Sequence, residues 1–133
     1  MFQPLSVPFG AKMLFNTVKL KPGVGIEDVE VAIGEMCNVV KNTYGGEAGG
    51  FLGGQVFKFS GFVSDEGSLG GAQLADGHVA IVTYWRSFEE HERSHADKTF
   101  KDRFAALEAM CTQSNELGYE MMWQGEPQAA KHA

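Results

Sequence analysis

Hydrophobic and polar positions alternate between strand-like and helix-like periods along the first half of the chain. Residues 12–20, KMLFNTVKL, alternate and are rich in β-forming side chains, which is typical of a strand. From Ile26 the apolar residues recur every three or four positions, which predicts a helix with one inward stripe that ends near Tyr44. The run GGEAGG should then break this helix.

The second half predicts two strands, a helical region and a last strand. Residues 51–62 predict a second strand, a Gly-rich loop follows, and residues 78–85, HVAIVTYW, predict the strongest strand of the chain. A charged helical stretch then leads into a helix with Phe100, Phe104, Leu107 and Cys111 on one side, and LGYEMMWQ, residues 117–124, predicts a last strand. The order β-α-β-β-α-β predicts an α+β, ferredoxin-like fold with its core at about residues 12–124.

The size of the chain bears on its assembly. The 133 residues fit one domain, residues 1–133, with a modest core between an N-terminal arm and a C-terminal tail. In a ferredoxin-like domain the helices cover one face of the sheet and leave the other exposed. We therefore expect a homodimer, or a higher homo-oligomer, that packs sheet against sheet.

Charge and cysteine content narrow the functional classes. The net charge of -6 argues against a nucleic-acid surface, which needs clustered Lys and Arg. No apolar stretch approaches the ~20 residues of a membrane span, and the N-terminus does not resemble a secretory signal. Cys37 and Cys111 form no C-x-x-C pair and suggest free thiols. We expect a soluble, cytoplasmic protein that binds neither nucleic acid nor membrane.

The segment HERSH holds the strongest candidate chemistry. His91 and His95 are four residues apart, so both rings project from the same side of a helix and can reach one metal ion. The alternative is that both belong to a solvated, charged helix face. The segment also matches the H-E-x-x-H motif of zinc proteases, in which Glu92 would activate a zinc-bound water. Arg93 inside the motif and the short β-α-β-β-α-β chain argue against a protease.

A metal that reacts with oxygen favours two histidines and one carboxylate on one face, which leaves the opposite face for substrate and O2. Three downstream residues offer the carboxylate: Glu116, Glu120 and Glu126. We predict Glu120, because it lies inside the expected last strand, where sheet pairing fixes the backbone.

Cys37 belongs to the inward stripe of the first predicted helix. One interpretation is a small buried hydrophobic residue, since free cysteine is among the most buried residue types. The other is a thiol that opens on a pocket and carries a persulfide. Lys41 is the only cationic side chain near it in sequence, which is a weak basis for an activated thiolate.

Several of these features occur together, and in this order, in one family. The chain resembles the sulfur oxygenase reductases, and the resemblance covers most of its length. It lies in LFNTVKL with Asn16, in EMCNVV with Cys37, in GGFLGGQ, in GGAQL, in YWRSFEEHERSH and in GYE. It implies a dimeric α/β barrel with mononuclear non-haem iron held by His91, His95 and Glu120. It also implies elemental sulfur or polysulfide as substrate, Cys37 as the persulfide carrier, and no external cofactor.

The chain departs from that family in three respects. It has one repeat where the family has two, so two copies would have to pair. Ala106 and Ala109 stand roughly where the family has further cysteines. The spacing to Glu120 is off by about one residue, which leaves Glu126 as a rival ligand.

The wider dimeric α/β-barrel group supplies other hypotheses. One is a metal-free enzyme that resembles the antibiotic biosynthesis monooxygenases, or a barrel that binds haem or another apolar small molecule. Haem degradation is disfavoured, because Phe104 stands about where those members have a haem-ligating histidine. Another is a regulatory or sulfur-carrier relative that holds a persulfide at Cys37 without turnover.

Overall fold

The computed structural model describes residues 2–70 and 78–128 of the chain. Its elements are, in order, β1 (Lys12–Leu20), α1 (Ile26–Thr43), the 3-10 helix η1 (Gly46–Ala48), β2 (Phe51–Lys58), β3 (His78–Trp85), α2 (Phe88–Ser94), α3 (Lys98–Glu108) and β4 (Cys111–Glu120). Most of the GGAQL motif lies outside the described residues. No helix in the described ranges combines the length and apolar character needed to cross a bilayer.

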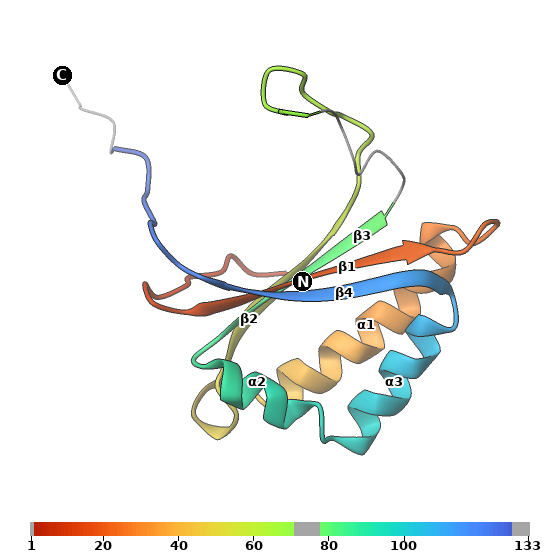
Figure 1. Cartoon of the computed structure of the whole chain (residues 1–133). Helices are drawn as coiled ribbons and strands as arrows, with labels where there is room; N and C mark the ends of the chain where they lie inside the picture. The colour runs from red at the N-terminus through yellow and green to blue at the C-terminus, as the bar shows by residue number, and fades with distance from the viewer. Residues whose placement is uncertain (1, 71–77, 129–133) are drawn as a thin grey trace.

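The four strands form one antiparallel sheet in the order β2-β3-β1-β4. Strand β1 lies in the centre and pairs with both β3 and β4. Helices α1, α2 and α3 all lie on one face of this sheet (Figure 1). The predicted α+β, ferredoxin-like fold is therefore confirmed, and β4 is an edge strand that lies beneath the helix layer.

The core forms between α1 and the sheet because the apolar residues of the helix recur at helical spacing. Val29, Ile33, Met36 and Val40 are the buried residues of α1. The first three pack with Val18, Val79, Ile81 and Leu107 in one cluster. Each fully buried aliphatic side chain contributes roughly 1.5–3 kcal/mol, so this stripe holds α1 on the sheet. The Asp28 carboxylate accepts a hydrogen bond from the Gly25 amide at 2.7 Å and caps the helix start.

Two element boundaries differ from the sequence prediction. Strand β2 ends at Lys58 and not near residue 62. Strand β4 runs over Cys111–Glu120 and not over residues 117–124, so Cys111 begins a strand and does not end a helix. The segment TQSNE is polar and gave no apolar period, but its backbone pairs with β1, for example Asn115 with Thr17. This segment is a strand because its backbone pairs with the central strand β1. A hydrophobic period could not have predicted that pairing.

The face of the sheet opposite the helices carries apolar side chains. Phe15 lies opposite Leu117 in the register and packs edge-on against Tyr119, with ring centroids 6.3 Å apart. Leu117 and Phe57 are each 51% exposed. The N-terminal arm reaches the sheet at Gly53, close to Leu5, and Gln124 Nε2 donates to the Val7 carbonyl at 2.8 Å. This face matches the surface that a sheet-to-sheet dimer would bury.

Candidate metal centre

The site is built on α2, a helix of seven residues that follows β3 directly. It begins at a cap, because Ser87 Oγ accepts a hydrogen bond from the Glu90 amide at 3.2 Å. His91, one turn further on, is only 5% exposed. Its ring packs edge-on against Trp85 with centroids 5.2 Å apart, and Trp85 Nε1 donates to Thr83 Oγ1 at 2.9 Å. The end of β3 therefore fixes the His91 ring against the sheet.

His95 follows at the C-terminal end of α2 and lies beside His91. The two Nε2 atoms are 3.1 Å apart, and the rings meet edge to face. Phe100, from the start of α3, stacks parallel to the His95 ring at 5.5 Å and 4°. The i, i+4 spacing thus brings both imidazoles to one point, as the sequence predicted, and aromatic contacts hold both rings in place.

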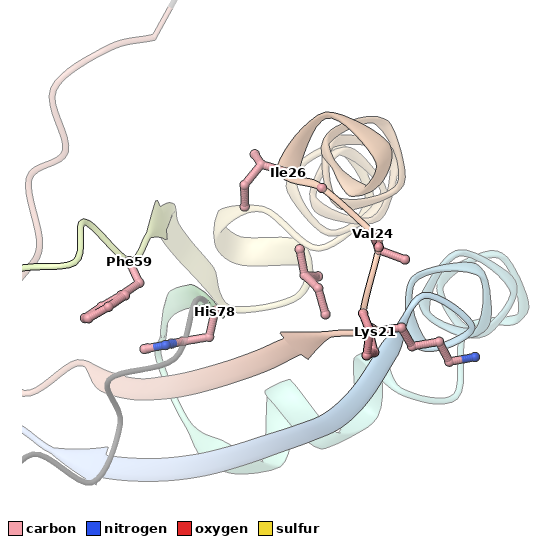
Figure 2. Close-up of a pocket in the computed structure, with 9 residues that line it drawn as sticks. Lys21, Val24, Ile26, Phe59 and His78 are labelled. Atoms are coloured by element: carbon pink, nitrogen blue, oxygen red, sulfur yellow. The ribbon is translucent and has the colours of Figure 1, made fainter.

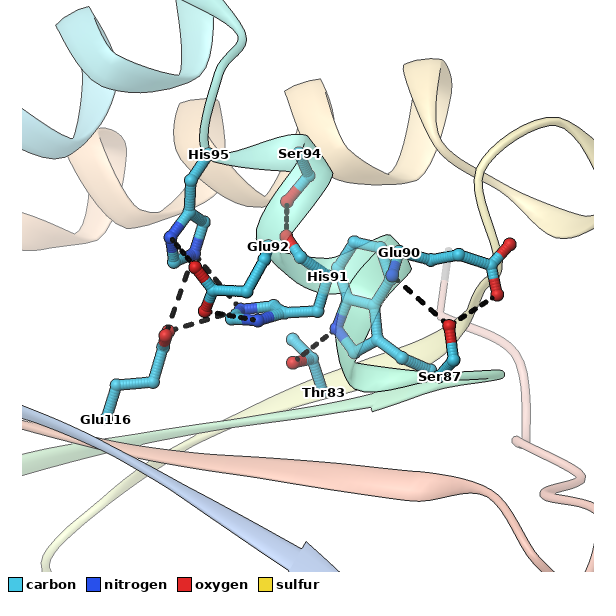
Figure 3. A network of polar contacts seen from close by, with 9 residues as sticks. Thr83, Ser87, Glu90, His91, Glu92, Ser94, His95 and Glu116 are labelled. Atoms are coloured by element: carbon cyan, nitrogen blue, oxygen red, sulfur yellow. Dashed lines mark hydrogen bonds and ion pairs between the residues drawn. The ribbon is translucent and has the colours of Figure 1, made fainter.

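A carboxylate from β4 completes the cluster. Glu116 Oε2 lies 3.3 Å from His91 Nε2, and Glu116 Oε1 lies 3.6 Å from His95 Nε2 (Figure 3). Burial disfavours the charged form of Glu116, but a hydrogen bond from the His91 ring and electrostatic attraction to His91 and His95 outweigh it, so the pKa of Glu116 is lowered. Glu116 is therefore held as the anion beside the two rings.

The spacing of the three donor groups fits a single metal ion. Two donors at about 2.1 Å from one ion lie about 3.0 Å apart at a right angle and about 3.4 Å apart at a tetrahedral angle. The two Nε2 atoms are 3.1 Å apart, one Glu116 oxygen lies 3.3 Å from His91 Nε2, and the other lies 3.6 Å from His95 Nε2, close to those values. Two imidazole nitrogens and one carboxylate are also a donor set that suits iron or zinc. His91, His95 and Glu116 can therefore act as three ligands from one side.

Glu92 takes a different position in the same cluster. Its carboxylate lies 3.6 Å from His91 Nδ1 and 3.8 Å from His95 Nδ1, and the side chain is 69% exposed. It belongs to the group of residues whose ligand atoms lie within 4.8 Å of one another. The Nδ1 atoms face away from the point that the Nε2 atoms share with Glu116. Glu92 thus resembles an outer carboxylate that orients metal-bound imidazoles, and not the water-activating base of a zinc protease.

The structure does not bring Glu120, the carboxylate that we predicted as third ligand, to the histidines. Glu120 is the last residue of β4, is 73% exposed and pairs with Lys12 Nζ at 3.1 Å. Glu126 follows the end of β4 and is also exposed. Because β4 begins at Cys111, the residue level with α2 is Glu116, four positions earlier than the prediction placed it. Glu116 was among the alternatives, and only the polar strand TQSNE would have favoured it.

Cys37 lies on α1 and packs against the core cluster formed by that helix and the sheet. It is partly buried, and burial raises the pKa of its thiol above the ordinary value of 9.0. Cys111 has its thiol pKa raised as well, first by burial and then by Glu108. Both shifts run opposite to the lowered pKa of an activated thiolate.

An open hollow of about 400 Å³ lies elsewhere, around the turn between β1 and α1 (Figure 2). Lys21, Val24, Ile26, Phe59 and His78 line it, and the rings of Phe59 and His78 stack at 5.1 Å. Its lining shares no residue with the histidine cluster. Among the residues that the structure describes, it brings no set of metal ligands together, and the histidine cluster is the candidate site.

Two supporting residues of the site were not assigned to it from the sequence. The sequence predicted Trp85 as the last residue of a strand and Phe100 as a core residue of its helix. Both are aromatic residues close to the histidines in sequence. Nothing in their spacing showed that their rings would face the imidazoles.

Comparisons with known proteins show which fold the chain has but do not identify its family. No protein-family model and no curated protein matches the chain at the level of sequence. Solved structures do match. One is SnoaB, a cofactor-independent oxygenase from Streptomyces nogalater, with 14% identity and a TM-score of 0.62 over 90% of this chain and 99% of that one.

Two further structures match to the same degree. A candidate antibiotic biosynthesis monooxygenase from Caulobacter crescentus has 14% identity and a TM-score of 0.62, over 86% of this chain and 92% of its own. A dimeric ferredoxin-like protein from Thermobifida fusca has 9% identity and a TM-score of 0.62, over 90% of this chain and all of its own.

These neighbours show a ferredoxin-like fold of the kind found in antibiotic biosynthesis monooxygenases. One of them is described as a dimer, and another as a cofactor-independent oxygenase. They give no support to the sulfur oxygenase reductase resemblance or to iron. At these identities the comparison carries the fold alone, so the chemistry has to be argued from the site.

Proposed function

We propose that the protein is an oxygenase-type oxidoreductase with a mononuclear metal centre held by His91, His95 and Glu116. The observation that carries the proposal is the mutual spacing of the three donor groups, which is that of ligands on one ion. Two histidines and one carboxylate with the opposite face open are the ligand set of non-haem iron oxygenases, so iron is the first metal to test.

Each side chain has a distinct part in this proposal. The Glu116 anion offsets part of the cation's charge. Trp85 and Phe100 hold the two rings by edge and stacking contacts. Glu92 lies near both Nδ1 atoms, so it would favour the proton on Nδ1 once a metal takes each Nε2. Iron bound there would supply a Lewis acid and a one-electron redox centre.

The substrate assignment from the sequence remains a prediction. Elemental sulfur or polysulfide, with Cys37 as persulfide carrier, follows from the family resemblance alone. The raised pKa of Cys37 and its packing against the core give that part of the hypothesis no added support. An apolar small molecule is equally compatible with the aromatic surroundings of the site. We also propose a homodimer that packs through the open sheet faces.

A second function is favoured by a specific observation. SnoaB shares this fold and is a cofactor-independent oxygenase. In a metal-free enzyme the same three residues would form a hydrogen-bonded network around His91 Nε2, whose single N–H can donate to the Glu116 carboxylate or to His95 Nε2. The two candidates share an oxygenase-type reaction and differ in whether a metal is bound.

Elemental analysis of protein purified without a His-tag separates them. We expect near-stoichiometric iron in the wild type, its loss in His91→Ala, and its retention in the control His78→Ala, which removes a histidine outside the cluster. Metal-free wild-type protein that still consumes O2 with a substrate would establish the second function instead. A folded wild type that neither holds metal nor consumes O2 would contradict both.

A further inference from the structure

One glycine lies at the contact between the last strand and the helix that carries both histidines. Gly118 stands on β4 two residues after Glu116, on the same helix-facing side of the strand. A Cβ atom placed on Gly118 would lie 2.9 Å from Cε1 and 3.2 Å from Cζ of Phe88. Contacts below about 3 Å between carbon atoms are repulsive, so the Phe88 ring rests on the bare backbone of this residue.

We infer that Gly118 is a positioning residue for the metal centre, an inference that rests on the proposed function. Phe88 is the first residue of α2, and His91 follows one turn later. On the strand, Glu116 lies two residues before Gly118. From Phe88 to His91 the helix advances about 4.5 Å, and from Gly118 back to Glu116 the strand advances about 6.8 Å. The two steps are of similar size, and the side chains of His91 and Glu116 span the difference. Phe88 on Gly118 therefore brings His91 over Glu116.

The partly buried Phe88 ring is in contact with the core on its other side. It packs against the buried cluster of Leu14, Val40 and Trp85. Lys12 Nζ lies 5.9 Å from the centroid of its ring. A methyl group on Gly118 would therefore push the start of α2 away from β4. The His91–Glu116 separation of 3.3 Å would grow with it.

The backbone conformation of Gly118 separates the clash with Phe88 from the backbone strain that replacing a glycine often causes. Gly118 is not among the glycines with positive φ, so alanine can adopt its conformation. Replacing a strand glycine by alanine at such a position is otherwise neutral or stabilising, because it restricts the unfolded chain. A loss of metal affinity in Gly118→Ala that shortening the Phe88 side chain restores would thus report on the distance between α2 and β4.

The test is a double-mutant cycle read by Co²⁺ titration, with the Co²⁺ absorption spectrum as a second readout. We expect Gly118→Ala to bind Co²⁺ about 10- to 100-fold more weakly, as for residues that orient metal ligands. Phe88→Leu shortens the opposing side chain, so the double variant Gly118→Ala/Phe88→Leu should recover to within a few fold of Phe88→Leu alone. Ser114→Ala, on the same side of β4, is the control and should match the wild type.

Each failure has its own signature. If the wild type binds no Co²⁺, the proposed metal centre is contradicted, and so is the inference that rests on it. Wild-type affinity in Gly118→Ala overturns the positioning role and leaves the centre intact. A weakened Gly118→Ala that Phe88→Leu does not rescue also overturns it, because the Phe88 contact is then not the cause. If Gly118→Ala does not fold, the test compares the double variant with Phe88→Leu alone. A difference between their Co²⁺ affinities of more than a few fold would contradict the inference.

Discussion

The histidine cluster and Cys37 were predicted as parts of one site, and the structure gives them opposite environments. At the cluster, polar groups from α2 and β4 converge, and the pKa of Glu116 is lowered. Cys37 packs against aliphatic neighbours in the core, and the pKa of its thiol is raised. One region stabilises charge and the other excludes it.

His91 and Cys37 show two kinds of burial, one among polar partners and one among apolar neighbours. His91 is more deeply buried than Cys37 but keeps polar groups near both ring nitrogens, as buried polar side chains generally do. Cys37 has the surroundings of a small apolar residue, for which burial stabilises the neutral form. The metal-site part of the sequence hypothesis therefore has a geometric basis that the persulfide part lacks.

The largest effect is expected from a matched pair of substitutions on β4. Glu116→Ala removes the proposed third ligand, whereas Glu120→Ala removes a carboxylate of the same type from the same face, four residues away. We expect Co²⁺ affinity to fall at least about 100-fold in Glu116→Ala and by less than about 2-fold in Glu120→Ala, since loss of a ligand exceeds the effect of outer groups. Isothermal titration of both variants measures this. Equal losses would restore Glu120 as a rival.

The second prediction concerns the pH dependence at Cys37. Its pKa is raised above 9.0 in the folded state, so the unfolded chain loses this proton first as the pH rises. The stability linked to the neutral thiol is thus present below pH 9 and is lost as the pH rises from there towards the folded pKa. The free energy of unfolding should fall by up to about 1.4 kcal/mol per pH unit more steeply in wild type than in Cys37→Ala.

Urea denaturation of both proteins at several values between about pH 8 and about pH 9.5 measures that slope. Alkylation of Cys37 should also run at least about 10-fold more slowly in the folded protein than in urea. Fast alkylation of the folded protein, with no slope difference, would show an activated thiol and would revive the persulfide carrier.

The smallest effect is expected at the start of α2. Ser87→Ala removes the oxygen that accepts from the Glu90 amide, and loss of such a cap costs about 1 kcal/mol of stability. Ser114→Ala, an exposed serine on β4, is the matched control and should change stability very little. Urea denaturation of both variants provides the comparison. An unchanged Ser87→Ala would mean that the Phe88 contact alone holds the helix.

The sequence predicted those parts of the fold that carry a hydrophobic period. The α1 stripe and the central strands β1 and β3 show their burial as a pattern of residues, so their bounds came out close to those observed. Strand β4 begins with TQSNE, which buries little, and it exists because β1 offers a row of backbone partners. That long-range pairing has no local signature, so the start of β4 was placed too late.

The start of β4 and its register on β1 also determine which carboxylate reaches the two histidines. The i, i+4 rule depends only on helix geometry, so it brought His91 and His95 together in advance. The carboxylate depends on how far β4 slides along β1, and the register puts Glu116 opposite Asn16 and Glu120 opposite Lys12. Four residues along a strand are more than a histidine can span. The partner carboxylate of a helix is therefore predictable only once the strand register is known.

All three helices lie on a single side of the sheet, and this has a consequence for two copies of the chain. Were they to associate through their uncovered sheet faces, each histidine cluster would stand on the outer layer of the assembly. The two centres would then be separated by the thickness of both sheets, and neither would borrow a group from its neighbour. Occupancy of one should leave the affinity of the other unaltered, and binding curves should be hyperbolic.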